Sequence, residues 1–191
     1  YLPSGKPCLK DGSMYVSFSH TMGYVAVAIH PSAEVGVDIE QYGVRVKRVA
    51  SRFIREDERA SVASGDEIYG LLLHWSAKET MFKLMNDQAV DFIDHLRIFP
   101  FRQNKSGMFK AFEYHSDKKR EFLIHYDTHP DFVLTFACLV LNVGTATLSN
   151  TGTTASVQDF RVGTFLRCHG VDDRFDALES IVVDVDVLDG L

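Results

Sequence analysis

The segment from Glu34 to Glu40 constrains the fold more than any other, because apolar and non-apolar residues alternate through it without a break. One face of the strand would carry Val35, Val37 and Ile39, and the other Glu34, Gly36, Asp38 and Glu40. This pattern predicts a half-buried strand whose aliphatic face enters a core. Because Gly36 has no side chain, we expect space beside the two acids at positions 38 and 40.

Hydrophobic periodicity predicts the remaining elements of an α+β fold with a mostly antiparallel sheet and packed helices. Strands are expected over residues 15–19, 24–29, 96–101, 108–114, 121–126 and 132–141. The spacing of Val46, Val49 and Phe53 predicts a helix, and a stronger helix is predicted over residues 67–85. The apolar side of the stronger helix would hold Leu71, Leu72, Trp75 and Phe82.

The last quarter of the chain differs in composition from the rest. Residues 144–191 open with a polar stretch over 145–154 and then carry eight acidic residues against three arginines. We therefore expect a domain over residues 1–143, followed by an acidic tail of unknown role over residues 144–191.

Composition excludes several classes of protein. The formal net charge is −6 and no basic block stands out, which argues against a nucleic-acid partner. No apolar run reaches about 18 residues, so no membrane-spanning helix is expected. The 3 cysteines are odd in number and widely separated, which is typical of a reducing, cytoplasmic setting rather than a disulfide framework.

The side chains of Asp38 and Glu40 leave the same face of the predicted strand. Two carboxylates this close repel each other unless a cation or a proton lies between them. Oxygen ligands of this kind favour Mg²⁺. The alternative is an ordinary solvated strand face, which is the usual place for acidic side chains.

Glu79 and Lys83 lie four residues apart on the stronger predicted helix and so share one flank. Glu79 would complete a three-acid metal site, and Lys83 would neutralise phosphate charge. An ordinary surface ion pair is the alternative. Ser19 and His20 are neighbours on a strand and point to opposite faces, so they do not form a nucleophile–base pair, and His20 is better placed to contact an anionic ligand.

Four motifs in order resemble those of the 4′-phosphopantetheinyl transferase superfamily. Residues 36–40 read G-V-D-I-E and match the motif G-[IV]-D-[IV]-E, and residues 75–83 match W-x-x-K-E-x-x-x-K. Upstream, residues 5–7 resemble a G-K-P segment and residues 17–21 resemble [NS]-x-S-H-[ST]. The order of the motifs makes the resemblance far more specific than any one of them.

The resemblance implies transfer of 4′-phosphopantetheine from coenzyme A to a serine of an acyl or peptidyl carrier protein, an activity of the holo-[acyl-carrier-protein] synthase type. By similarity, Asp38, Glu40 and Glu79 would hold Mg²⁺, and Glu79 and Lys83 would be the catalytic residues. Coenzyme A would be bound by Lys6, Ser19, His20 and Lys83.

The chain resembles the surfactin-synthetase-type branch of the family more than the short trimeric branch, which favours a monomer over a trimer. In that branch two lobes flank the active site, and most of the first lobe would precede residue 5, so the first lobe is expected to be incomplete here. Glycines that often follow the last lysine of the helix motif are missing from residues 84–90.

Two other functions fit parts of the sequence. A non-catalytic module that binds coenzyme A or a carrier protein would need only part of the site. A different Mg²⁺-dependent phosphoryl enzyme, such as a nuclease, would fit the acids but not the charge of the chain. The sequence does not distinguish fatty-acid, polyketide and peptide-synthetase carriers.

Overall fold

The computed structural model describes residues 6–85, 89–139, 161–166 and 179–183. Its strands are β1 (Tyr15–Thr21), β2 (Tyr24–His30), β3 (Glu34–Gln41), β4 (Leu96–Ile98), β5 (Ser106–Glu113), β6 (Glu121–His129), β7 (Phe132–Leu139), β8 (Arg161–Leu166) and β9 (Glu179–Val183). Its helices are the α-helices α1 (Arg59–Val62) and α2 (Glu67–Met85) and the 3₁₀ helices η1 (Val44–Arg48), η2 (Ala50–Arg52) and η3 (Glu56–Glu58).

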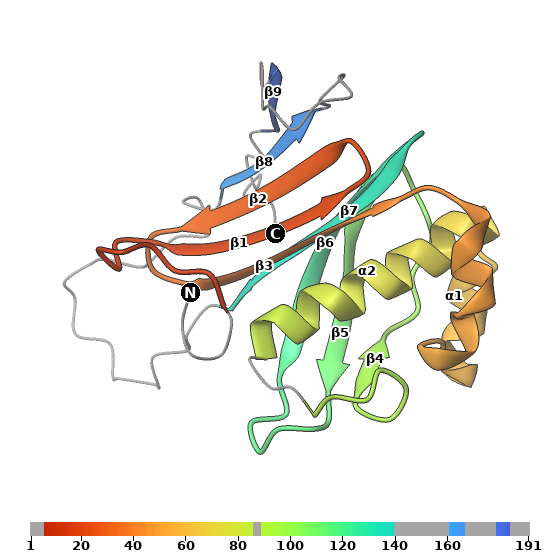
Figure 1. Ribbon diagram of the computed structural model, residues 1–191. Coiled ribbons are helices and arrows are strands. Elements are labelled where there is room, and N and C mark those ends of the chain that lie inside the picture. Colours follow the sequence, from red (N-terminus) through yellow and green to blue (C-terminus); the bar gives the residue numbers. More distant parts are fainter. Residues whose placement is uncertain (1–5, 86–88, 140–160, 167–178, 184–191) are drawn as a thin grey trace, which may run out of the picture.

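The main layer is an antiparallel five-stranded sheet in the order β3-β7-β6-β5-β4. The helix α2 lies across one face of it (Figure 1). The core between them contains Leu73, Met81 and Leu84 from α2 and Ile124 and Val133 from the sheet. The predicted α+β class, with a mostly antiparallel sheet and packed helices, is confirmed.

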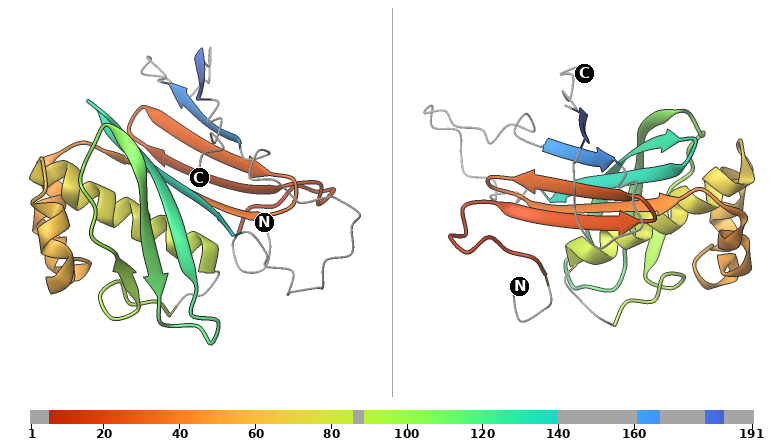
Figure 2. Two further views of the ribbon diagram at one scale, coloured as in Figure 1. Left: turned by 180° about the vertical axis from the view of Figure 1, so that it is seen from behind. Right: turned by 45° about the horizontal axis from the view of Figure 1, so that its top comes forward.

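The hairpin of β1 and β2 belongs to a second sheet, in the order β1-β2-β8-β9. Figures 1 and 2 show β3 running between this hairpin and α2. Ala26 and Ala28 of β2 are fully buried against the aliphatic face of β3. These small side chains let the hairpin lie close to β3, and together with the aliphatic side chains of β3 they form a second core.

Both faces of β3 are therefore covered. Val37, on the hairpin side, is 0% exposed, and Asp38, on the α2 side, is only 4% exposed. The predicted alternation is present, but the expectation of a half-buried strand was wrong, because α2 packs over the face that carries the acids.

At Gly36, α2 approaches β3 very closely. A Cβ atom placed there would lie 2.7 Å from the backbone oxygen of Thr80 and 2.9 Å from Cγ of Leu84. The expected space beside the acids is thus filled by α2 itself. The glycine serves helix–strand packing rather than ligand access.

Most predicted elements are found, with shifts at their ends. The stronger helix occupies residues 67–85 as predicted, whereas the helix expected around Val46 and Phe53 consists of the 3₁₀ helices η1 and η2. The strand expected over 96–101 ends at Ile98, just before Pro100, which lacks the N–H needed to continue a ladder. The strand expected to reach residue 141 is described as far as Leu139.

Within the expected tail, β8 pairs with β2 and β9 pairs with β8. The backbone of residues 161–166 therefore extends the sheet of the hairpin. The predicted linker over 145–154 lies outside the described residues. In the described part of the chain, no helix combines the length and the apolar character that crossing a membrane requires.

A buried ion pair fixes α2 to the segment that precedes it. The side chains of Lys78 and Glu58 are both 0% exposed, and Nζ donates to Oε2 over 2.9 Å. The same ammonium donates to the backbone oxygens of Phe53 and Phe92, and Oε1 of Glu58 accepts from the backbone N–H of Ile98. These partners come from the segment before η3, the segment before β4 and β4 itself, so the pair joins several segments at one point.

We expect Gly36→Ala to lower the free energy of unfolding by about 1–3 kcal/mol, because the added methyl group forces α2 away from β3. Urea denaturation measures the change. Gly43→Ala is the matched control, since a Cβ atom at Gly43 would meet nothing within 4 Å and its φ of 170° is extended. Equal stability of the two variants would contradict the packing role of Gly36.

Candidate active site

The acids of β3 face the flank of α2 that carries Glu79 and Lys83. Asp38 is directly opposite Thr135 in the ladder of β3 and β7, which fixes its position on the face toward α2. Two side-chain donors reach the same oxygen of Asp38. Ser19 Oγ and Lys83 Nζ each lie 2.8 Å from Oδ1.

The second oxygen of Asp38 is buried, and no partner for it is found among the described residues. A carboxylate oxygen without a donor in such a place is costly, and it is the kind of atom that a cation would satisfy. Asp38 is thus half satisfied, with its protein donors on one oxygen and its other oxygen available.

Lys83 reaches from α2 to β3. Its ammonium donates to Oδ1 of Asp38 and, over 2.8 Å, to the backbone oxygen of Val37. The alternative of a simple surface pair with Glu79 does not describe it, because these contacts hold the charge against the strand. The Lys83 side chain is still 27% exposed, so part of it faces solvent.

Glu40 is held by Trp75. The indole Nε1 donates to Oε1 of Glu40 over 2.7 Å, from one turn before Glu79 on α2. Burial raises the pKa of Glu40, and the negative charge of Asp38 raises it further against the opposing effects of Trp75 and Lys83.

Glu79 is partly buried, and no hydrogen bond to its carboxylate is found within the described residues. Burial and the charge of Asp38 raise the pKa of Glu79 to about 7, with a further contribution from Glu40 and opposition from Lys83. The charge effects require the groups to lie near one another. The structure therefore brings Asp38, Glu40, Glu79 and Lys83 into one electrostatic cluster.

Sequence reasoning missed a set of buried hydroxyl groups beneath this cluster. Thr135 Oγ1 lies 2.8 Å from Ser76 Oγ and 2.8 Å from Thr80 Oγ1, and Ser76 also donates to the backbone oxygen of Asp38. Polar residues at buried positions of an apolar helix and strand were the available signal. These hydroxyl groups connect α2 to β3 and β7 near the point where the Glu79 side chain projects from the helix.

The residues predicted to bind coenzyme A differ in whether they contact the acidic cluster. Ser19 contacts the cluster directly, and Lys6 forms an ion pair of 2.6 Å with Glu34 at the start of β3. His20 is exposed on the opposite face of β1 from Ser19. The structure therefore joins Ser19 to the acids, and it does not bring His20 into contact with them.

The chemistry of the donor set fits a divalent cation. It offers three carboxylates, among which the charge of Asp38 raises the pKa of both Glu40 and Glu79, and one buried oxygen without a partner among the described residues. In the described ranges, however, no three His, Cys, Asp or Glu side chains stand close enough together to hold a metal ion. The Lys83 ammonium provides the positive charge beside Asp38 in this arrangement.

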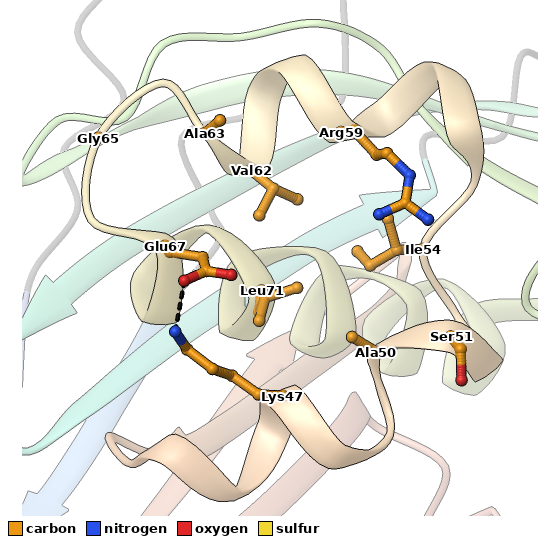
Figure 3. Close-up of a pocket in the computed structure, with 10 residues that line it drawn as sticks. All are labelled: Lys47, Ala50, Ser51, Ile54, Arg59, Val62, Ala63, Gly65, Glu67 and Leu71. Carbon is orange, nitrogen blue, oxygen red and sulfur yellow. Dashed lines mark hydrogen bonds and ion pairs between the residues drawn. The ribbon is translucent and has the colours of Figure 1, made fainter.

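A cavity of about 610 Å³ lies elsewhere, between η1, η2, α1 and the start of α2 (Figure 3). Ile54, Val62 and Leu71 form its apolar wall, and Lys47 and Arg59 lie at its rim. Leu71 and Glu79 are separated by eight residues of helix, or roughly 12 Å along the axis. The cavity is therefore distinct from the acidic cluster.

Comparison with known protein families gives one match. The family model described as the 4′-phosphopantetheinyl transferase superfamily (ACPS) matches residues 34–137, more than half of the 191-residue chain. The matched region begins with β3 and includes α2, so it contains the whole acidic cluster. No curated protein matches the chain.

The pKa of Glu79 predicts a pH dependence for the metal-free protein. Its folded pKa of about 7 lies above the ordinary value of 4.5, so its contribution to stability is complete below pH 4.5 and is lost as the pH rises through 7. Glu79→Gln removes this loss. We expect the variant to gain about 1 kcal/mol relative to the wild type between pH 5 and pH 8, after allowance for solvent screening. Urea unfolding in EDTA measures this gain, and parallel stability curves would refute it.

Proposed function

Because the chain belongs to the 4′-phosphopantetheinyl transferase superfamily, we propose that it transfers the 4′-phosphopantetheine group of coenzyme A to a serine of an acyl or peptidyl carrier protein. The observation that carries the proposal is the cluster of Asp38, Glu40, Glu79 and Lys83 between β3 and α2, inside the matched region. Adenosine 3′,5′-bisphosphate is the second product.

In this reaction the serine oxygen forms a bond to the β-phosphorus of coenzyme A. The bond from that phosphorus to the bridging pyrophosphate oxygen breaks, and the electron pair leaves with the nucleotide. Negative charge grows on the phosphate oxygens, so a fixed ammonium such as that of Lys83 favours the transition state. Its contacts with Asp38 and Val37 hold this group in place before the substrate arrives.

Asp38, Glu40 and Glu79 would hold Mg²⁺, and the unpartnered oxygen of Asp38 supports this assignment. When bound, the ion would neutralise pyrophosphate charge beside Lys83. Binding would also join a strand to a helix and so stabilise the fold by mass action.

The serine must lose its proton during the attack. Glu79, with a pKa of about 7, can accept a proton near neutral pH, either directly or through a water beside it. Coordination to a cation weakens a carboxylate as a base, which favours the route through water.

Lys6, Ser19 and His20 are the proposed contacts of the nucleotide end. Lys6 contacts Glu34 at the start of β3, and Ser19 contacts Asp38 near the middle of the strand. His20 is exposed at the end of β1, where an incoming anion can reach it.

A basic surface follows the acidic strand directly. Arg45, Arg48 and Arg52 on η1 and η2 are exposed, and no ion pair to any of them is found in the part of the chain that the structure describes. Val44 beside them is 64% exposed. In acyl and peptidyl carrier proteins the acceptor serine lies on an acidic helix, which basic groups around an apolar side chain would complement. We therefore propose this surface as the site for the carrier protein.

The surfactin-synthetase-type branch and a monomeric state remain our proposal for the form of the enzyme. The support is the length of chain between the two acidic motifs, which here contains η1, η2, η3 and α1. We propose an enzyme of the holo-[acyl-carrier-protein] synthase type that acts in the cytoplasm.

Asp38→Ala should lower transfer by at least about 100-fold, because it removes both a proposed metal ligand and the partner of Lys83. Mass spectrometry of an apo carrier incubated with coenzyme A and Mg²⁺ measures the product as a phosphopantetheine-sized addition. Asp117→Asn, in the exposed turn between β5 and β6, is the matched control and should retain full activity. Full transfer by Asp38→Ala would exclude the proposed site, whereas coenzyme A binding without transfer by the wild type would favour a non-catalytic binding module.

Charge reversal of the basic surface should weaken carrier recognition alone. For the double variant Arg45→Glu and Arg48→Glu, we expect the KM for the carrier to rise about 10-fold and the KM for coenzyme A to stay unchanged. Steady-state kinetics with each substrate varied in turn distinguishes the two effects. Lys118→Glu, in the exposed turn after β5, is the control and should change neither value. An unchanged carrier KM in the double variant would place carrier binding elsewhere.

A further inference from the structure

Trp75 is the single tryptophan of the chain, and its indole contacts the acidic cluster directly. The ring lies on the side of α2 that faces β3, and its N–H donates to Oε1 of Glu40 over 2.7 Å. The N–H of a buried indole usually finds an acceptor. Here the acceptor is one of the proposed metal ligands, so the same hydrogen bond also acts on the site.

The indole is held in place by other aromatic rings. Its ring centroid lies 5.1 Å from that of Phe53, in an edge-on arrangement, and 5.5 Å from that of Phe92. Phe53 is 0% exposed, so it forms a firm support. The N–H of Trp75 accordingly points at Glu40 from a fixed position.

Only one oxygen of Glu40 is occupied in this way. No hydrogen bond to Oε2 is found among the residues that the structure describes. A donor on one oxygen restricts rotation of the carboxylate and sets the direction of the other oxygen. Such outer donors typically contribute 10- to 100-fold to metal affinity or activity.

We propose that Trp75 is a positioning residue that orients the Glu40 carboxylate for a divalent cation, and that its emission reports occupancy of the site. This inference rests on the proposed function, since it assigns Glu40 to the cation. It assigns to Trp75 no contact with substrate or with the reacting atoms.

The matched control lies two turns along the same helix. Phe82 packs against Phe92 with ring centroids 6.1 Å apart, as Trp75 does at 5.5 Å, and contributes no hydrogen bond to Glu40. Trp75→Phe removes the donor and keeps an aromatic ring. Phe82→Leu perturbs the same aromatic group and leaves the donor in place.

The first measurement follows tryptophan emission of the wild-type protein during titration with MgCl₂ alone. We expect a saturable change that is lost in Asp38→Asn, which keeps both Trp75 and Glu40. The second measurement is calorimetric titration of MgCl₂ into Trp75→Phe and Phe82→Leu. We expect Mg²⁺ affinity to fall 10- to 100-fold in Trp75→Phe and to stay unchanged in Phe82→Leu. Melting temperatures of both variants show how much packing has been lost.

Equal Mg²⁺ affinity in Trp75→Phe and the wild type would overturn the inference, whatever the melting temperatures. If Trp75→Phe does not fold, the emission titration decides alone, and Mg²⁺ binding without an emission change would overturn the inference. Absence of Mg²⁺ binding to the wild type would overturn it as well. Failure of the proposed function is separate, because it appears as Mg²⁺ binding without transfer to any carrier.

Discussion

The close packing of α2 on β3 is the constraint on which the rest of the structure depends. At Gly36 the helix backbone comes so near the strand that no side chain fits between them. This close approach allows the ammonium of Lys83, on α2, to reach Asp38 on β3. It also brings Glu79 near enough for Asp38 to raise its pKa. A wider gap would leave the same side chains as separate surface charges.

Part of the charge buried near this contact is matched by donors from the protein itself. Asp38 receives an ammonium and a hydroxyl, and the deeper pair of Lys78 and Glu58 satisfies its remaining atoms with backbone groups. Such a pair is weak evidence for stability in itself, because desolvation offsets much of the attraction. Its clearer effect is to fix α2 relative to η3 and the segment before β4. The orientation of Glu79, the next residue along, depends on that arrangement.

Much of this arrangement could be predicted from sequence, because it follows from local patterns. Strict alternation placed Asp38 and Glu40 on one face, and helical spacing placed Glu79 and Lys83 on one flank. Contacts between distant segments could not be predicted in that way. Nothing in the pattern indicated that Lys83 would bind Asp38 instead of Glu79, or that Thr135 would join two hydroxyl groups of the helix. These contacts depend on the distance between helix and sheet, which periodicity does not contain.

After Glu40 the chain leaves the buried acidic cluster and forms the exposed helices η1 and η2. The strand and helix that carry the acids are buried on several sides. By contrast, η1 and η2 pack on the core through Val46 and Ala50 and present their other side chains to solvent. Substitutions on that outer surface leave the packing at Gly36 untouched. Under the proposed function, selection could therefore alter the choice of partner at this surface while the acidic cluster stays constant. In evolutionary terms, recognition and reaction would be separable traits of this chain.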